Sequence, residues 1–143
     1  MRQLISALMG LVFAASVAAG ELSSTAPTQA RAYIITPENG QTVETRFTVR
    51  FGLAGMGVAP AGVERDNTGH HHLLIDTDVA DLDLDKPLPA TDQVKHFGGG
   101  QTETVLELPP GQHTLQLLLG DDNHVPHDPP IYSKKITITV PPY

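Results

Sequence analysis

Hydrophobic and polar positions alternate along most of this chain beyond residue 30. Because the side chains of a β-strand point alternately to its two faces, this pattern predicts strands that bury one face. The alternation is clearest within residues 42–53. There the apolar parity holds Val43, Phe47, Val49, Phe51 and Leu53, and the other parity holds Arg46, Thr48 and Arg50.

Apolar and β-branched runs separated by glycine and proline predict further strands at 31–36, 71–77, 102–108, 112–119 and 131–140. In the last of these, the residues expected to face inward are Tyr132, Ile136, Ile138 and Val140. No segment shows a convincing helical period. The sequence therefore predicts an all-β fold, an immunoglobulin-like β-sandwich of about seven strands. A Greek-key barrel is the competing architecture.

The first residues have the features of a secretory signal peptide. Arg2 precedes an apolar run over residues 4–19 that ends in small residues suited to cleavage. The run is short for a membrane span of about 20 residues, which disfavours the alternative of an uncleaved anchor. We therefore predict a signal peptide at 1–20, a flexible leader at 21–29 and one sandwich domain at 30–143. The protein is expected in the periplasm or secreted, with no membrane insertion after cleavage.

Composition narrows the classes of partner. The formal net charge of −7 argues against binding nucleic acid or anionic lipid through charge. The chain has no cysteine, so it has neither disulfides nor thiolate ligands. Any metal ion would have to be held by histidine, carboxylate, methionine or backbone oxygen.

Histidine is the residue type that points to chemistry, because neutral imidazole is the commonest protein ligand of transition metals. Three polar segments hold six of the seven histidines: His70, His71 and His72 lie in 68–76, His96 in 95–103, and His124 and His127 in 120–130. Side chains two residues apart on a strand share a face, so His70 and His72 can reach one ion. His71 then points toward the core or its rim.

The candidate ligands are therefore His70, His72, His124 and His127, with His96 as a fifth. Asp128 follows His127 and is the candidate acceptor that orients its ring. Each segment also has an explanation without a ligand: exposed histidines where a strand begins, an acidic turn, or an ordinary glycine loop after His96.

For two other residues, a structural role is a better explanation than metal binding. His113 lies on the apolar parity of its strand, where a hydrogen-bonded, half-buried histidine is the more common outcome. Met56 is a soft metal donor in a glycine-rich loop, but packing is its better explanation.

Four motifs resemble a known family. They are Gly69-His-His-His-Leu-Leu-Ile-Asp76, His96-Phe-Gly-Gly-Gly-Gln-Thr-Glu103, the segment 109–121 that begins Pro-Pro-Gly-Gln-His, and Asn123-His-Val-Pro-His-Asp-Pro-Pro130. The family comprises small secreted bacterial proteins described as a domain of unknown function, some of which carry a rod-shape-determining label. The resemblance spans roughly residues 30–140, apart from 78–95. It implies an exported β-sandwich, brings no established activity, and places the family's histidine positions on all seven histidines of this chain.

Three functions are compatible with these features. The first is an envelope module that binds copper(II) or zinc(II), ions for which nitrogen and carboxylate ligands are suited. The second is a non-catalytic domain that binds a protein or glycan of the cell envelope. The third is a hydrolase, for which a covalent nucleophile is disfavoured because the chain has no cysteine and neither G-x-S-x-G nor H-E-x-x-H occurs. Metal-assisted hydrolysis stays open, since three histidines and a free coordination position suffice for it.

Overall fold

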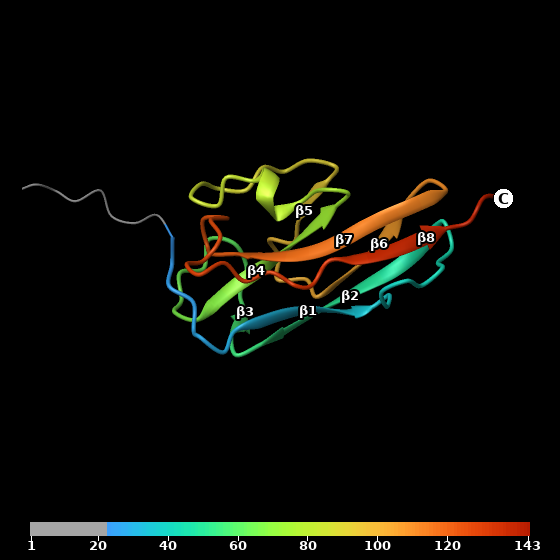
Figure 1. Ribbon diagram of the computed structural model, residues 1–143. Helices are drawn as coiled ribbons and strands as arrows, with labels where there is room; N and C mark the ends of the chain where they lie inside the picture. Colours follow the sequence, from blue (N-terminus) through green and yellow to red (C-terminus); the bar gives the residue numbers. More distant parts are fainter. Residues whose placement is uncertain (1–22) are drawn as a thin grey trace, which may run out of the picture.

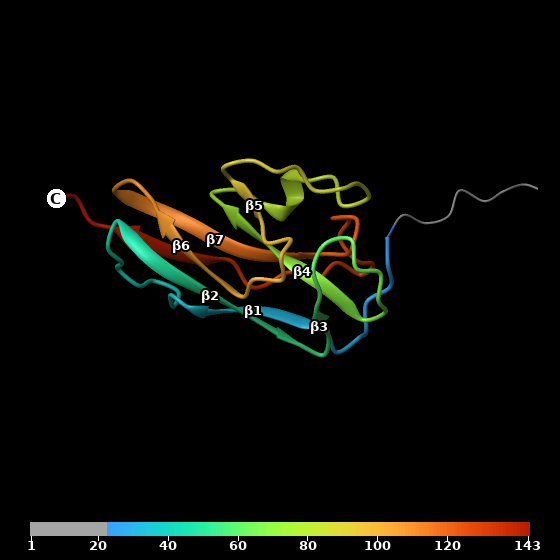
Figure 2. The same ribbon diagram turned by 180° about the vertical axis from the view of Figure 1, so that it is seen from behind.

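The computed structural model describes residues 23–143, which form two β-sheets packed face to face (Figure 1, Figure 2). The predicted signal peptide lies outside the described residues. The smaller sheet is antiparallel and has the order β1-β2-β6. Its strands are β1 (Arg31–Thr36), β2 (Arg46–Ala54) and β6 (Glu103–Glu107).

The larger sheet has the order β3-β4-β7-β8, with β5 also paired to β4. Its strands are β3 (Gly57–Val58), β4 (Thr68–Ile75), β5 (Val94–His96), β7 (Gly111–Gly120) and β8 (Ile136–Val140). β3 runs parallel to the first residues of β4, and β5 runs antiparallel to its middle. The two short strands thus share one edge of β4, and β7 occupies the other edge.

The division of strands between the sheets is that of an immunoglobulin-like sandwich. In such a fold, strands A, B and E lie in one sheet and strands C, F and G in the other. With β3 set aside, β1, β2 and β6 correspond to the first set, and β4, β7 and β8 to the second. The predicted all-β sandwich is confirmed. The sequence pattern missed β3 and β5, because two or three residues are too few to show an alternation.

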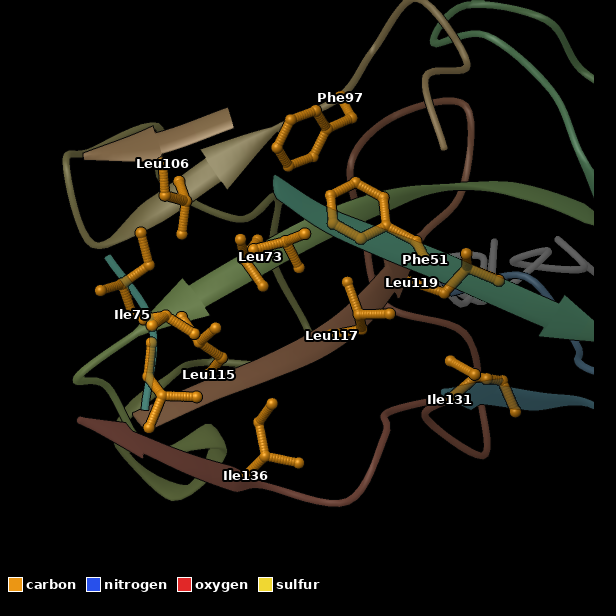
Figure 3. Close-up of a cluster of buried hydrophobic side chains, with 14 of the residues drawn as sticks. Phe51, Leu73, Ile75, Phe97, Leu106, Leu115, Leu117, Leu119, Ile131 and Ile136 are labelled. Atoms are coloured by element: carbon orange, nitrogen blue, oxygen red, sulfur yellow. The ribbon is translucent and has the colours of Figure 1, made fainter. Parts of the chain in front are cut away.

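The core lies between the sheets and uses the parities that the sequence predicts. Figure 3 shows Leu115, Leu117 and Leu119 of β7 beside Phe51 and Leu73, and each of these side chains is at most 3% exposed. β4 turns alternate residues into this core, so His71 enters it together with Leu73 and Ile75. The ring of His71 lies 5.2 Å from that of Phe51, as its parity predicts.

Tyr132 differs from its predicted inward position. β8 begins only at Ile136, and Tyr132 is 50% exposed, although Ile136, Ile138 and Val140 are buried as expected. The buried residues upstream are instead Ile131 and Ser133, and Ser133 Oγ accepts a hydrogen bond from Leu117 N at 2.8 Å. The alternation therefore does not continue through the two lysines between Ser133 and Ile136.

The leader expected to be flexible is joined to the sandwich from Ser24 onward. Ser24 O accepts a hydrogen bond from Asp128 N at 2.9 Å, and Ala26 N donates to Asp128 O at 3.2 Å. Ala26 is only 5% exposed and belongs to the main core. These residues therefore contribute to the domain rather than precede it.

A long connection covers the outer face of the larger sheet. We call residues 78–93 the strap; it includes one 3-10 turn, η1 (Val79–Asp81), and lies on the side of β4 and β7 away from β1 and β2 (Figure 1, Figure 2). A second buried cluster holds it there, made by Leu74, Leu88, Val94 and Leu118. Within residues 23–143, no helix has the length and hydrophobicity needed to cross a membrane.

Candidate metal centre

β4 directs two of its three consecutive histidines to the outer face of the larger sheet. His70 is paired with Gly120 of β7, and His72 is paired with both Leu118 of β7 and His96 of β5. Paired residues of neighbouring strands share a face, so the rings of His72 and His96 meet, with centroids 4.3 Å apart. A two-residue spacing and one strand pairing thus bring three imidazoles together.

Gly120 makes room for the ring of His72. A Cβ atom at Gly120 would lie 2.5 Å from His72 Cε1 and 3.3 Å from the Cα of His124. Any larger residue would push the ring away or displace the turn that follows β7. The glycine at the end of β7 therefore has a steric role in the site.

The turn after β7 brings in the fourth histidine. His124 has φ of 64°, in the left-handed region that histidine adopts only uncommonly. Asp121 holds this turn, because its Oδ1 accepts hydrogen bonds from Asn123 N at 2.9 Å and Val125 N at 3.0 Å. Its Oδ2 accepts a third bond, from Ser24 Oγ at 3.0 Å. Asp121 is 2% exposed, so these bonds satisfy a buried carboxylate.

The resulting histidine cluster comprises His70, His72, His96 and His124. Ring centroids are 4.7 Å apart for His70 and His72, and 4.8 Å apart both for His70 and His124 and for His96 and His124. One ligand nitrogen from each of His70, His72 and His124 lies within 4.8 Å of the other two. The rings come from β4, β5 and the turn after β7.

Several nitrogens of the cluster lack hydrogen-bond partners among the described residues. His70 Nε2 and His124 Nδ1 share one hydrogen bond at 2.9 Å. His70 Nδ1 and both nitrogens of His72 are buried and have no partner within residues 23–143. A buried polar atom without a partner costs on the order of 1–3 kcal/mol, so a native protein seldom keeps several of them together without a use.

The three histidines of the triad, His70, His72 and His124, are uncharged at neutral pH. Burial, followed by repulsion from neighbouring imidazoles, lowers the pKa of His70 to about 4 and the pKa of His72 to about 2. Burial and the nearby His96 also lower the pKa of His124. A neutral imidazole keeps one nitrogen lone pair, which is the form that binds a metal ion.

The spacing of the nitrogens suits a transition-metal ion. A tetrahedral ion with bonds of about 2.0–2.1 Å holds its ligand nitrogens roughly 3.4 Å apart. That separation lies between the 2.9 Å contact of His70 with His124 and the 4.8 Å that bounds the triad. The separation of two nitrogens would have to change by at most about 1.4 Å for the triad to surround a tetrahedral ion, a change within reach of ring rotation.

His96 lies beside the triad with its tautomer fixed. Its Nε2 is 2.9 Å from Pro89 O, and a carbonyl oxygen only accepts, so Nε2 carries the proton. The lone pair of the neutral ring is then on Nδ1. Donation from the other ring nitrogen to a backbone carbonyl is the usual arrangement of a metal-bound histidine.

His127 lies apart from the cluster. Its Nε2 donates to Thr68 O at 3.1 Å, and its Cε1 would lie 2.9 Å from a Cβ atom at Gly69. Gly69 has the parity of His71, so His127 sits on the opposite face of β4 from His70. Asp128, the expected orienting acceptor, is exposed and pairs with the leader through its backbone.

The carboxylate next to the cluster is Asp121 rather than Asp128. Asp121 is not among the site residues expected from the sequence. The sequence feature that could have identified Asp121 is the run Asp121-Asp-Asn123 directly after a predicted strand. Aspartate at such a position commonly accepts a hydrogen bond from the backbone two residues further on. Asp121 also lies close enough for its charge to oppose the lowering of the His70 pKa.

The fold and this cluster define a small all-β sandwich with four histidines gathered on one outer sheet face, two of them fully buried. The chain belongs to the family described as Domain of unknown function (DUF4399), whose family model matches residues 49–141. That range includes all seven histidines. No curated protein and no solved structure matches the chain.

Proposed function

We propose that this protein is an exported metal-binding module, located in the periplasm or secreted, which holds copper(II) or zinc(II). The ligands are His70, His72 and His124, with His96 as the fourth. All four donors are imidazole nitrogens, which suit both ions, and the general order of affinity favours copper. His127 is left out of the ligand set because it faces the other side of β4.

One observation carries the proposal. His70, His72 and His124 each place one nitrogen within 4.8 Å of the other two, His70 and His72 are 0% exposed, and three nitrogens of these two buried rings have no partner among the described residues. Packing alone does not explain this arrangement, because apolar side chains of the same size would fill the space without the cost of unpaired polar atoms. A bound ion would coordinate one nitrogen of each ring, including one of the two unpaired nitrogens of His72.

The direct test is calorimetric titration of the protein with copper(II) and with zinc(II), beside a His70→Ala/His72→Ala variant. We expect one ion per chain for the wild type and no comparable binding for the variant. His113→Ala is the matched control, because this histidine lies outside the cluster. If the wild type binds no more tightly than the double variant, the metal proposal is rejected, and a domain that binds an envelope partner becomes the better hypothesis.

A further inference from the structure

The histidine cluster is closed from most directions. β4 and β7 lie beneath it, and His70 and His72 are fully buried. The two cluster members with partial exposure are His96 and His124. An ion that enters or leaves must therefore pass beside these two rings.

The strap is fastened at these two histidines. Leu88 N donates a hydrogen bond to His124 O at 2.9 Å, and the next residue, Pro89, accepts one from His96 Nε2 at 2.9 Å. Two consecutive strap residues thus bridge the turn after β7 and strand β5. Figure 1 and Figure 2 show the strap running beside that turn in both views.

Few side chains hold the strap to the sheet. Leu88 is 4% exposed and packs with Leu74, Val94 and Leu118, and the half-buried Val79, Leu82 and Leu84 pack against this cluster. These contacts are separate from the main core between the sheets. A segment held by a small separate cluster opens at lower free energy than the sandwich unfolds.

The hydrogen bond from His96 Nε2 to Pro89 O couples metal binding to the position of the strap. An ion on His96 Nδ1 withdraws electron density from the ring, which makes the Nε2–H a stronger donor to Pro89 O. Metal binding therefore strengthens the hydrogen bond that holds the strap closed. By thermodynamic reciprocity, a closed strap increases the metal affinity by the same factor.

Resting on the metal function proposed above, we propose that the strap is the gate of the centre. It closes over the ion through Leu88 and Pro89, and it must open before the ion leaves. The rate of metal release, and hence delivery to an acceptor, is then set by strap opening rather than by breaking the ligand bonds alone.

The experiment combines hydrogen exchange with metal-release kinetics. Exchange of the Leu88 amide is measured in the metal-free and zinc-loaded protein, and zinc release into an excess of chelator is followed for the wild type and for Leu88→Ala. We expect zinc to slow exchange at Leu88 by roughly 10-fold or more, within the range typical of coupled sites. Leu88→Ala should speed zinc release by about the same factor, because most affinity changes appear in the dissociation rate.

Ile35→Ala is the matched control, since Ile35 is an apolar residue 54% exposed on β1 in the other sheet. Its release rate should equal that of the wild type. Circular dichroism checks that both variants keep the sandwich.

The outcomes separate the two proposals. If zinc binds through His70 and His72 but leaves Leu88 exchange and the Leu88→Ala release rate unchanged, the gate is rejected and the metal function stands. If the wild type binds no zinc, both are rejected. If Leu88→Ala loses the sandwich signal, Leu88 exchange in the wild type decides the question alone.

Discussion

The histidines at the two ends of the β4–β7 strand pair differ in the hydrogen-bond partners of their ring nitrogens. At one end, the histidine cluster directs nitrogens at one another, and several have no partner among the described residues. At the other end, His113 Nδ1 donates to Asp76 Oδ2 at 2.7 Å and its Nε2 donates to Pro109 O at 2.8 Å. Both partners are acceptors, so His113 carries two ring protons.

Burial alone does not separate these two environments, because the His113 side chain is itself only 10% exposed. Burial lowers the pKa of His113, but the hydrogen bonds to Asp76 and Pro109 outweigh it, and the pKa is raised. For His70 and His72 no comparable hydrogen bonds to acceptors oppose burial, and their pKa values are lowered. The partner atoms therefore decide whether a histidine is a charged structural link or a neutral candidate ligand.

The largest expected effect comes from exchanging a histidine for leucine at each end. His72→Leu should weaken metal binding by more than roughly 100-fold, beyond what changes outside the ligand set produce. The metal-free variant should be as stable as the wild type or more stable by about 1 kcal/mol, because a buried ring without partners is removed.

His113→Leu should show the reverse behaviour. It leaves Asp76 and Pro109 without their donor and should lower the free energy of unfolding by about 1.5–3 kcal/mol, with metal affinity unchanged. Calorimetry and urea denaturation measure both quantities. A His72→Leu protein that binds the ion as well as the wild type would contradict the comparison.

The next largest effect concerns Asp121, which holds the turn that carries His124. Asp121→Ala removes the acceptor for Asn123 N and Val125 N, so metal affinity should fall by about 10–100-fold, as for other groups that orient ligands. Asp128→Ala is the control, because Asp128 is exposed and holds its neighbours through backbone hydrogen bonds, and the metal affinity of this variant should match that of the wild type. Equal losses in both variants would mean that the acidic charge of the loop, not the turn geometry, matters.

Substitution of Gly120 tests whether the ring of His72 needs the space that this glycine leaves open. Gly120→Ala should lower the free energy of unfolding by about 1–3 kcal/mol through overpacking and should also weaken metal binding. Gly57→Ala is matched to it, because a Cβ atom at Gly57 meets nothing closer than 3.6 Å. Thermal denaturation with and without zinc compares the two, and similar curves for both variants would argue against a tightly packed cluster.

The smallest effect is the pH dependence of stability, which should have opposite signs at the two ends. The raised pKa of His113 stabilises the folded protein fully below the unfolded value of about 6.5, and this contribution is lost as the pH rises through the folded pKa. The lowered pKa values of His70 and His72 destabilise the metal-free fold as the pH falls from about 6.5 toward 4.

Urea denaturation between pH 4 and pH 9 checks this comparison. His113→Leu should flatten the alkaline side of the stability profile, and His72→Leu should flatten part of the acid side. A variant that flattens the side assigned to the other histidine would show that the protonation states are assigned the wrong way round.

The strands with long alternating patterns were accessible from the sequence. Segments 31–36 and 112–119 agree closely with β1 and β7, and the two-residue spacing placed His70 and His72 on one face. The pattern is reliable there because burial of one face repeats every second residue. It did not reveal β3, β5 or the inward turn of Ser133, since those depend on pairing with distant residues.

The amino-acid sequence by itself determined the all-β sandwich, the parity of its core residues and the kind of side chain available for chemistry. Only the tertiary structure decided which histidines meet, because His96 and His124 reach His72 through strand pairing and a turn rather than through sequence spacing. It also separated His127 from the cluster and put Asp121 in the place expected for Asp128. Proximity between distant segments depends on the register and packing of the whole sheet, which no local pattern records.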